Sequence, residues 1–160
     1  MKVLVIGSDG QLGSELKKMA KSCKNISWIF SVVKTLDLLD LSSINFYLIK
    51  MNPSIIINCA AYTNVDKAEV EPELAETINY KAVEAISKWT SDNNKKLIHV
   101  STDYVFDGLS NIPLSENSKT KPINEYGSSK LKGEIACLKN DPNSIVIRTS
   151  WLYSSFGKNF

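Results

Sequence analysis

Lys2 to Gly13, which reads Lys-Val-Leu-Val-Ile-Gly-Ser-Asp-Gly-Gln-Leu-Gly, is the stretch that decides the fold of this chain. Lys2 to Ile6 is a short β-rich apolar run and predicts a buried strand. The glycines that follow make the turn into a helix that we expect to run through about Ser22. In such a unit one glycine makes the tight turn, another lets the backbone approach a pyrophosphate, and a third lets helix and strand pack closely. The helix N-terminus offers free N–H groups to phosphates, so the stretch predicts a dinucleotide site, with a ligand-free glycine turn as the alternative.

Strand and helix patterns alternate along the rest of the chain. Further strands are predicted at residues 26–33, 54–58, 96–101 and 144–148, and further helices at 42–51, 72–92 and 125–138. Each strand is nearly all apolar, which indicates a parallel sheet covered by helices on both faces. No repeat or linker interrupts the pattern. We therefore expect one doubly wound, Rossmann-like α/β domain over residues 1–160.

The bulk composition argues against several classes of function. The 160 residues are 43% hydrophobic and 22% charged, as in an ordinary globular domain. A net charge of +2 is too balanced to favour nucleic acid as a partner. No stretch has the length of a membrane span, and the first apolar run is too short for a signal peptide. Three cysteines without metal-ligand spacing fit reduced thiols in a cytoplasmic protein, and no metal site is expected.

Tyr126 and Lys130 are the residues that most directly suggest chemistry. They lie four positions apart in Tyr-Gly-Ser-Ser-Lys, within a predicted helix, and so share one face. The ammonium favours phenolate, so we expect the tyrosine pKa to fall from about 10 toward working pH. Ser101 or Thr102, at the end of a predicted strand, offers a hydroxyl to a reacting carbonyl oxygen. Together these groups predict proton donation to a carbonyl that receives hydride from a cofactor.

The end of the second predicted strand bears on the choice of cofactor. An acidic residue there would bind the ribose 2′-OH, whereas basic or small polar residues tolerate a 2′-phosphate. Residues 31–34 contain no carboxylate, and Lys34 could meet a phosphate. We therefore expect NADPH rather than NADH, the alternative being that Lys34 is a solvated surface residue.

Six segments together resemble the extended short-chain dehydrogenase/reductase superfamily and, within it, the dTDP-4-dehydrorhamnose reductase family. Their order and spacing fit this family over the whole chain. The segments are Gly7 to Gly13, Leu36 to Asp40, Asn58 to Glu69, Ser101 to Gly108, Tyr126 to Lys130 and Arg148 to Tyr153. The resemblance implies a cytoplasmic oxidoreductase that uses NAD(P)H to reduce the 4-keto group of dTDP-4-dehydro-L-rhamnose. The product, dTDP-L-rhamnose, serves surface polysaccharide biosynthesis.

The same resemblance implies roles for individual residues. The catalytic places fall on Thr102, Tyr126 and Lys130. Cofactor places fall on Tyr126 and Lys130 together with Gly7, Gly10, Gln11, Leu12, Gly13, Asp37, Leu38, Ala60, Ala61 and Tyr62. Places near the sugar nucleotide fall on Val65, Asp103, Val105 and Trp151, and for the tryptophan a plain packing role is the alternative.

The chain departs from the family in two respects. The family often has an acidic residue where this chain has Ser31, which bears on cofactor preference. Family members are also nearly twice as long, so the resemblance implies a cofactor-binding half that lacks the C-terminal substrate domain. We therefore expect weak NADPH binding with little or no turnover. We also expect an exposed apolar sheet edge that favours assembly into a homo-oligomer.

Two other functions stay open. A non-catalytic regulatory subunit of the same fold, such as the β subunit of methionine adenosyltransferase, would serve a partner enzyme, although intact Tyr126 and Lys130 argue against this. A sugar-nucleotide dehydratase or epimerase is the second alternative. Dehydratases of the superfamily commonly place Asp-Glu after the hydroxyl position, whereas here Asp103 is followed by Tyr104. Elimination would therefore lack its second acid.

Overall fold

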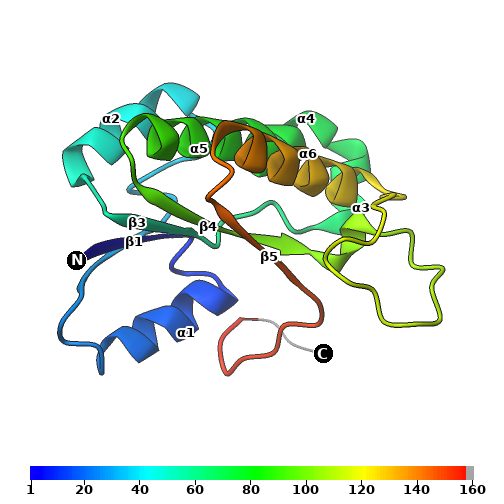
Figure 1. Ribbon diagram of the computed structural model, residues 1–160, viewed down its shortest axis with the longest axis horizontal. Helices are drawn as coiled ribbons and strands as arrows, with labels where there is room; N and C mark the ends of the chain where they lie inside the picture. The colour runs from blue at the N-terminus through cyan, green and yellow to red at the C-terminus, as the bar shows by residue number, and fades with distance from the viewer. Residues whose placement is uncertain (158–160) are drawn as a thin grey trace.

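The computed structural model describes residues 1–157 and contains one parallel sheet with the strand order β2-β1-β3-β4-β5 (Figure 1). The strands are β1 (Lys2–Ile6), β2 (Ser27–Ser31), β3 (Ile55–Asn58), β4 (Lys96–Thr102) and β5 (Ile145–Thr149). The doubly wound α/β fold predicted from the alternating pattern is confirmed. The strand order reverses between β1 and β3, and ligands bind at the carboxyl ends of the strands beside such a switch point.

The helices divide unequally between the two faces of the sheet. One face carries α2 (Leu41–Met51), α4 (Pro72–Glu76), α5 (Ala82–Asp92) and α6 (Glu125–Asn140), whereas α1 (Gln11–Ala20) lies on the other (Figure 1). The expectation that helices cover both faces is therefore only partly correct. Side chains alternate along a strand, so Ile145 and Ile147 point away from α6 and stay 54% and 45% exposed.

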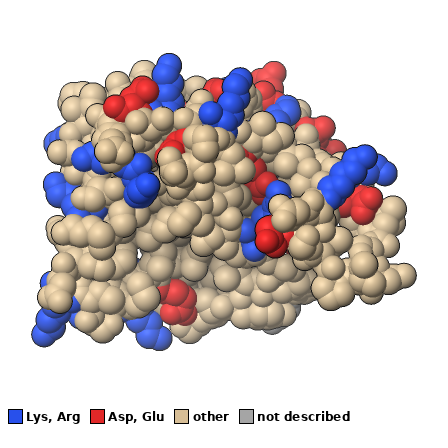
Figure 2. All heavy atoms as spheres, viewed as in Figure 1, with Lys and Arg blue, Asp and Glu red and all other residues tan. Residues whose placement is uncertain are grey.

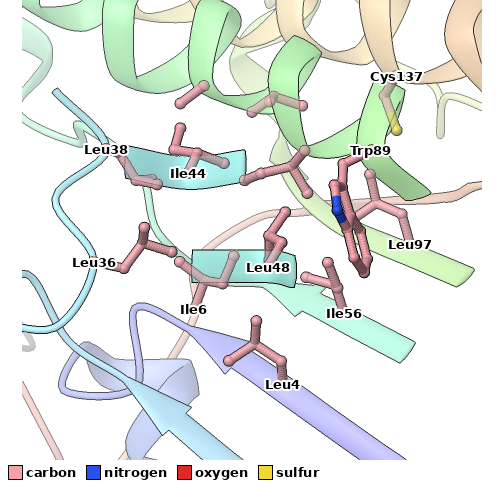
Figure 3. Packing of buried hydrophobic residues seen from close by; sticks show 13 residues of the cluster. Leu4, Ile6, Leu36, Leu38, Ile44, Leu48, Ile56, Trp89, Leu97 and Cys137 are labelled. Carbon is pink, nitrogen blue, oxygen red and sulfur yellow. The ribbon is translucent and has the colours of Figure 1, made fainter. Parts of the chain in front are cut away.

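The core fills the space between the sheet and the helices of the more covered face. Leu4 and Ile6 of β1 meet side chains of α2 and α5, including Leu48 and Trp89 (Figure 3). Helical spacing of apolar residues brings one side of each helix onto the strands. Each fully buried aliphatic side chain contributes about 1.5–3 kcal/mol to folding. This core fixes the strand ends at which the candidate site lies.

The long helix predicted over residues 72–92 is interrupted. A π-helical turn, η1 (Thr77–Lys81), separates α4 from α5 and brings Asn79 into the interior with 1% exposure. Such turns insert one residue into a helix and often occur at functional sites. The carbonyl oxygen of Asn79 lies against Gly133 of α6, where a Cβ atom would collide with it.

Two short elements were not predicted, because they are too short to show a hydrophobic period. One is α3 (Val65–Val70), whose first turn is capped by Asn64, and the other is the 3₁₀ turn η2 (Asp103–Val105). The side chain of Thr102 caps η2 by accepting from the N–H of Tyr104 at 3.2 Å. Both elements follow directly on the carboxyl ends of strands or their loops, so they shape the edge where ligands bind.

The surface shown in Figure 2 carries basic and acidic side chains interspersed with uncharged ones. This fits the small net charge of +2. None of the helices within residues 1–157 is long and apolar enough to cross a membrane.

Candidate cofactor and catalytic site

The glycine turn after β1 has the geometry that its sequence predicted. Gly7 takes a φ of 76°, and a Cβ there would lie 2.7 Å from the backbone of Ala60. At Gly13 a Cβ would collide with the carbonyl oxygen of Gly7. Gly10, the N-cap of α1, meets only the Gly7 oxygen at 3.4 Å. The glycines therefore hold strand, turn and helix close while leaving open space at Gly10.

A cavity of about 450 Å³, which we call the cofactor cleft, opens beside this turn. This volume lies within the range of small-molecule sites. It joins the glycine turn to the ends of β3 and β4 and to α6. Its lining comprises Gly7, Asp9, Gly10, Gln11, Leu12, Val33, Cys59, Ala60, Ala61, Thr63, Val100, Ser101, Tyr126, Lys130, Thr149 and Leu152. A smaller pocket of about 170 Å³ shares part of this lining and adds Asp37 and Leu38.

Four of the residues predicted for the cofactor, Gly13, Asp37, Leu38 and Tyr62, do not line the cleft, although Asp37 and Leu38 line the smaller pocket. Gly13 sits in the close contact between α1 and the turn. The side chain of Tyr62 turns away, and its hydroxyl donates to Glu71 at 2.6 Å. Thr63, which the sequence did not single out, lines the cleft instead.

Of the three predicted catalytic residues, Tyr126 and Lys130 line the cleft and Thr102 does not. Tyr126, Lys130 and Thr102 are 8%, 2% and 6% exposed. Helix α6 starts just before the tyrosine because Asn124 accepts from the N–H of Gly127 at 2.7 Å. The Thr102 hydroxyl donates to the carboxylate of Asp103 at 3.2 Å. The alternative hydroxyl, that of Ser101, is buried without a hydrogen-bond partner within the described part of the chain and lines the cleft.

The expected lowering of the tyrosine pKa is wrong for this structure. Burial raises the pKa of Tyr126, the hydrogen bond with Thr102 opposes that rise, and the nearby charge of Asp103 adds to it. Lys130 does not offset the burial, since its ammonium donates to the carbonyl of Val100 at 2.6 Å. The phenol therefore stays protonated at neutral pH, as an acid must before it gives up its proton.

The pKa of Lys130 is also shifted from its ordinary value. Burial lowers the pKa of its ammonium to about 8, while the charge of Glu134 and then that of Cys59 act in the opposite direction. Glu134 is engaged in a bidentate pair with Arg148, with Nη2 to Oε2 at 2.7 Å. A buried lysine with a pKa near neutrality in a cleft is a common feature of functional sites.

The residues predicted near a sugar nucleotide are only partly brought together. Asp103 and Trp151 line a second cavity of about 390 Å³ beside the cofactor cleft. Trp151 is 67% exposed and has a φ of 50°. Val105 is fully buried, and Val65 packs on the small cluster of Ala68, Ala75 and Tyr126. Their predicted roles stay predictions.

Ser31, at the end of β2, supports the glycine turn through hydrogen bonds. The carbonyl of Ser31 accepts from the N–H groups of Gly7 and Ser8 at 3.1 and 2.9 Å. Its hydroxyl pairs with that of Thr35 at 3.0 Å. Ser31 therefore supports the glycine turn from beneath, and the exposed Lys34 that follows is the basic side chain at this strand end.

His99 in β4 and Cys59 after β3 have structural rather than reactive surroundings. His99 is fully buried, and its Nδ1 pairs with the Asn58 amide at 3.3 Å. Cys59 lines the cleft, and burial raises the pKa of its thiol to about 11, so it is not an activated nucleophile. Within residues 1–157, no group of three His, Cys, Asp or Glu side chains could hold a metal ion.

Asn79 is the functional-site residue that sequence reasoning missed. Its carboxamide pairs with both the N–H and the C=O of Tyr62, at 2.9 and 3.0 Å, and donates to the Ser129 hydroxyl at 3.0 Å. It thus ties the loop after β3 to the helix that carries Tyr126. An amide within an apolar helical stripe, next to Ile78, was the available signal.

Comparison with known proteins places this arrangement in a family. The family model described as the RmlD substrate binding domain matches residues 1–160. The chain belongs to the RmlD substrate binding domain family. Among curated relatives, the dTDP-4-dehydrorhamnose reductase of Salmonella typhimurium is 40% identical over 162 residues. That alignment covers 100% of this chain and 54% of the relative, so the chain spans about half the length of the curated relatives it matches.

Solved structures of dTDP-4-dehydrorhamnose reductases agree closely with this chain in fold. A dTDP-4-dehydrorhamnose reductase from Clostridium acetobutylicum superposes with a TM-score of 0.95 at 37% identity, covering 100% of this chain and 56% of that one. The dTDP-4-dehydrorhamnose reductase from Bacillus anthracis, solved in complex with NADP, gives 0.94 at 36% identity, covering 99% and 56%.

Proposed function

We propose that residues 1–160 form the dinucleotide-binding domain of an NAD(P)H-dependent dTDP-4-dehydrorhamnose reductase. One observation carries the proposal: a single cleft joins the glycine turn of β1 to Tyr126 and Lys130 of α6. The reductase relatives, one of them solved with NADP, support the choice of activity and cofactor.

The residues of the cleft suit a dinucleotide from one end to the other. The start of α1, at Gln11 and Leu12, lines the cleft and suits a pyrophosphate, because the first N–H groups of a helix have no acceptor within the helix. The pocket at Asp37 and Leu38 continues the cleft past β2 and suits the adenosine end. Lys34 at this end favours the 2′-phosphate of NADPH over NADH.

The catalytic step would use the protonated phenol of Tyr126. When bound, the cofactor supplies the hydride that reduces the 4-keto group. Tyr126 gives its proton to the keto oxygen, which becomes the hydroxyl. The ammonium of Lys130, four residues further along on the same helix face, supplies a positive charge near this site. General acid help of this kind contributes about 10²–10⁴-fold to the rate.

The same proposal assigns the substrate, the cellular location and the tendency to self-associate. The substrate is a dTDP-linked 4-keto sugar, with the cavity at Asp103 and Trp151 on the sugar-nucleotide side. The protein works in the cytoplasm. The exposed Ile145 and Ile147 favour self-association into a homo-oligomer, which sedimentation velocity over a concentration series would detect.

A cofactor titration tests the proposal. The affinity for NADPH, measured through the fluorescence of NADPH, should fall at least about 100-fold in Gly10→Trp, because the indole would fill the cleft. Phe46→Trp is the matched control, since Phe46 is 71% exposed on α2 and outside the cleft lining. Equal affinity in the wild type and Gly10→Trp would remove the glycine turn from the proposed site.

A turnover assay tests the second half of the proposal. With the 4-keto sugar nucleotide and NADPH, the 160-residue chain should oxidise NADPH little or not at all, because Trp151, which lines the cavity proposed for the sugar nucleotide, is 67% exposed. Full turnover by the purified chain would refute the assignment of a cofactor-binding domain alone. Consumption of NADPH also distinguishes a reductase from a dehydratase, which leaves no net consumption.

A further inference from the structure

The segment after β5 turns back and packs on α1. Residues 150–157, which we call the strap, follow Thr149 at the end of β5. Trp151 has a φ of 50°, a left-handed conformation that ends the extended strand. Figure 1 shows this segment, drawn in orange to red, running from β5 toward α1. Because β3 and β4 lie between β1 and β5 in the sheet, the strap spans the strands whose ends line the cofactor cleft.

The strap is attached on both sides of the cleft. At its start, the Ser150 hydroxyl donates to Oδ2 of Asp103, just after β4, at 2.8 Å. Further along, Nε2 of Gln11, the first residue of α1, donates to the carbonyl of Leu152 at 2.8 Å. Gln11 and Leu152 both line the cleft. Their hydrogen bond therefore joins the α1 wall of the cleft to its β5 wall.

Glu15 holds the far end of the strap. It lies four residues after Gln11 on α1 and so shares a helix face with it. Its Oε1 accepts from the hydroxyls of Ser154 at 2.9 Å and Ser155 at 3.4 Å. The hydrogen bond from Ser154 lowers the pKa of Glu15, so the carboxylate is charged at neutral pH. Glu15 does not line the cleft, so it bears on the cleft through the strap rather than by touching a ligand.

We propose that Glu15 is a positioning residue that holds the strap closed over the cofactor cleft, so that a dinucleotide enters and leaves only when the strap lifts from α1. A pyrophosphate at the start of α1 would lie next to Gln11, where the strap meets the helix. With the strap closed, the cleft still has a volume of about 450 Å³, so closure and occupancy are compatible. The identity of the ligand rests on the proposed function, whereas the closure of the strap by Glu15 does not.

Alkylation of Cys59, whose residue lines the cleft, tests the closure without any cofactor. Mass spectrometry of the peptide that contains Cys59 follows its reaction with iodoacetamide. Glu15→Ala should raise this rate at least about fivefold, because losing hydrogen bonds to a charged group favours the open strap, and Ser154→Ala should act in the same direction. Lys18→Ala, on an exposed residue of α1, is the matched control and should leave the rate unchanged.

Glu15→Gln separates the hydrogen bonds of Glu15 from its charge. The variant keeps an acceptor oxygen for the two serine hydroxyls but loses the charge, so its labelling rate should stay within about twofold of the wild type. Equal acceleration in Glu15→Ala and Glu15→Gln would show that charge is responsible, and the proposal would fail. A wild-type rate in Glu15→Ala would overturn it as well.

A disulfide between the strap and α1 provides the opposite test. A Cβ at Gly157 would lie 3.4 Å from the Cβ of Gln11, close to the separation of about 3.5–4.5 Å in disulfides. Gln11→Cys combined with Gly157→Cys should therefore form a disulfide on oxidation, which peptide mapping identifies. The oxidised and reduced forms share both substitutions, so only the lock differs between them.

In the oxidised form, the labelling of Cys59 should slow severalfold. The rates of NADPH association and dissociation, measured by stopped-flow fluorescence, should fall together with little change in affinity, because a closed strap slows entry and exit alike. Equal rates in the oxidised and reduced forms would overturn the proposal. A wild-type protein that binds no NADPH would count against the proposed function alone, since the labelling needs no cofactor.

Discussion

The cofactor cleft and the β5 margin lie on the same sheet, but their side chains are buried to very different degrees. In the cleft, Tyr126 and Lys130 are almost fully buried, and the lysine ammonium is held by a backbone carbonyl. At the β5 margin, defined by Ile145, Ile147 and Trp151, large apolar side chains are 54%, 45% and 67% exposed. The difference arises because the loops and α6 enclose the cleft, whereas α1 covers only part of its own face of the sheet (Figure 1). Substitutions should therefore have large effects in the cleft and small ones at the margin.

The largest expected effect lies inside the glycine turn. Gly13→Ala should lower the free energy of unfolding by on the order of 4 kcal/mol, because the new Cβ collides with backbone that cannot give way. Gly10→Ala is the matched control in the same motif and should cost less than about 1 kcal/mol. Urea denaturation of the two variants measures both values. Similar losses at the two positions would contradict the geometry of the turn.

Lys130→Met should stabilise the protein at neutral pH. The pKa of the buried ammonium is about 8 in the folded protein against its ordinary value of 10.5, so folding is opposed by its charge. This cost, about 3 kcal/mol at most, is fully present below about pH 8 and disappears as the pH rises toward 10.5. The gain from Lys130→Met should follow the same course, reduced by the lost hydrogen bond to Val100.

Thermal melts of the wild type and Lys130→Met at pH 7 and pH 10 measure this difference. The variant should melt higher at pH 7, and the gap should close at pH 10. A lower melting temperature at pH 7 would mean that the ammonium stabilises the cleft. Burial of the ammonium would then contribute to the stability of the fold rather than oppose folding.

The smallest effect is expected at the β5 margin. Ile147→Thr should change the free energy of unfolding by no more than about 0.5 kcal/mol, because the side chain is already half exposed. The same substitution at Ile56, fully buried in β3, should cost about 2 kcal/mol through lost contacts and a buried hydroxyl. Chemical denaturation of both variants gives the comparison. A large loss at Ile147 would show that the margin is covered in solution.

Local pattern was enough to predict most of the fold. The strands appear within two residues of their expected bounds, because each is an apolar run bounded by turn residues. The break in the helix over residues 72–92 was not predictable, since a π turn keeps the helical spacing on both sides. Likewise α3 is too short, at 6 residues, for periodicity to show it.

The candidate site was predictable in its membership but not in its electrostatics. Spacing alone placed Tyr126 and Lys130 on one helix face, and both line the cleft. Spacing could not show that the ammonium would turn to the carbonyl of Val100, or that burial would raise the phenol pKa. These depend on what packs around each group, and the partners come from residues far apart in the chain.

By itself the sequence determined the order of strands and helices, the glycine turn and the pairing of phenol with amine, because each depends on neighbours within a few positions. Only the tertiary structure decided the pairing of Asn79 with Tyr62, the hold of Asp103 on Thr102 and Ser150, and the exposure of Ile145 and Ile147. Burial and long-range hydrogen bonds are properties of the packed molecule, so they arise only when distant segments meet.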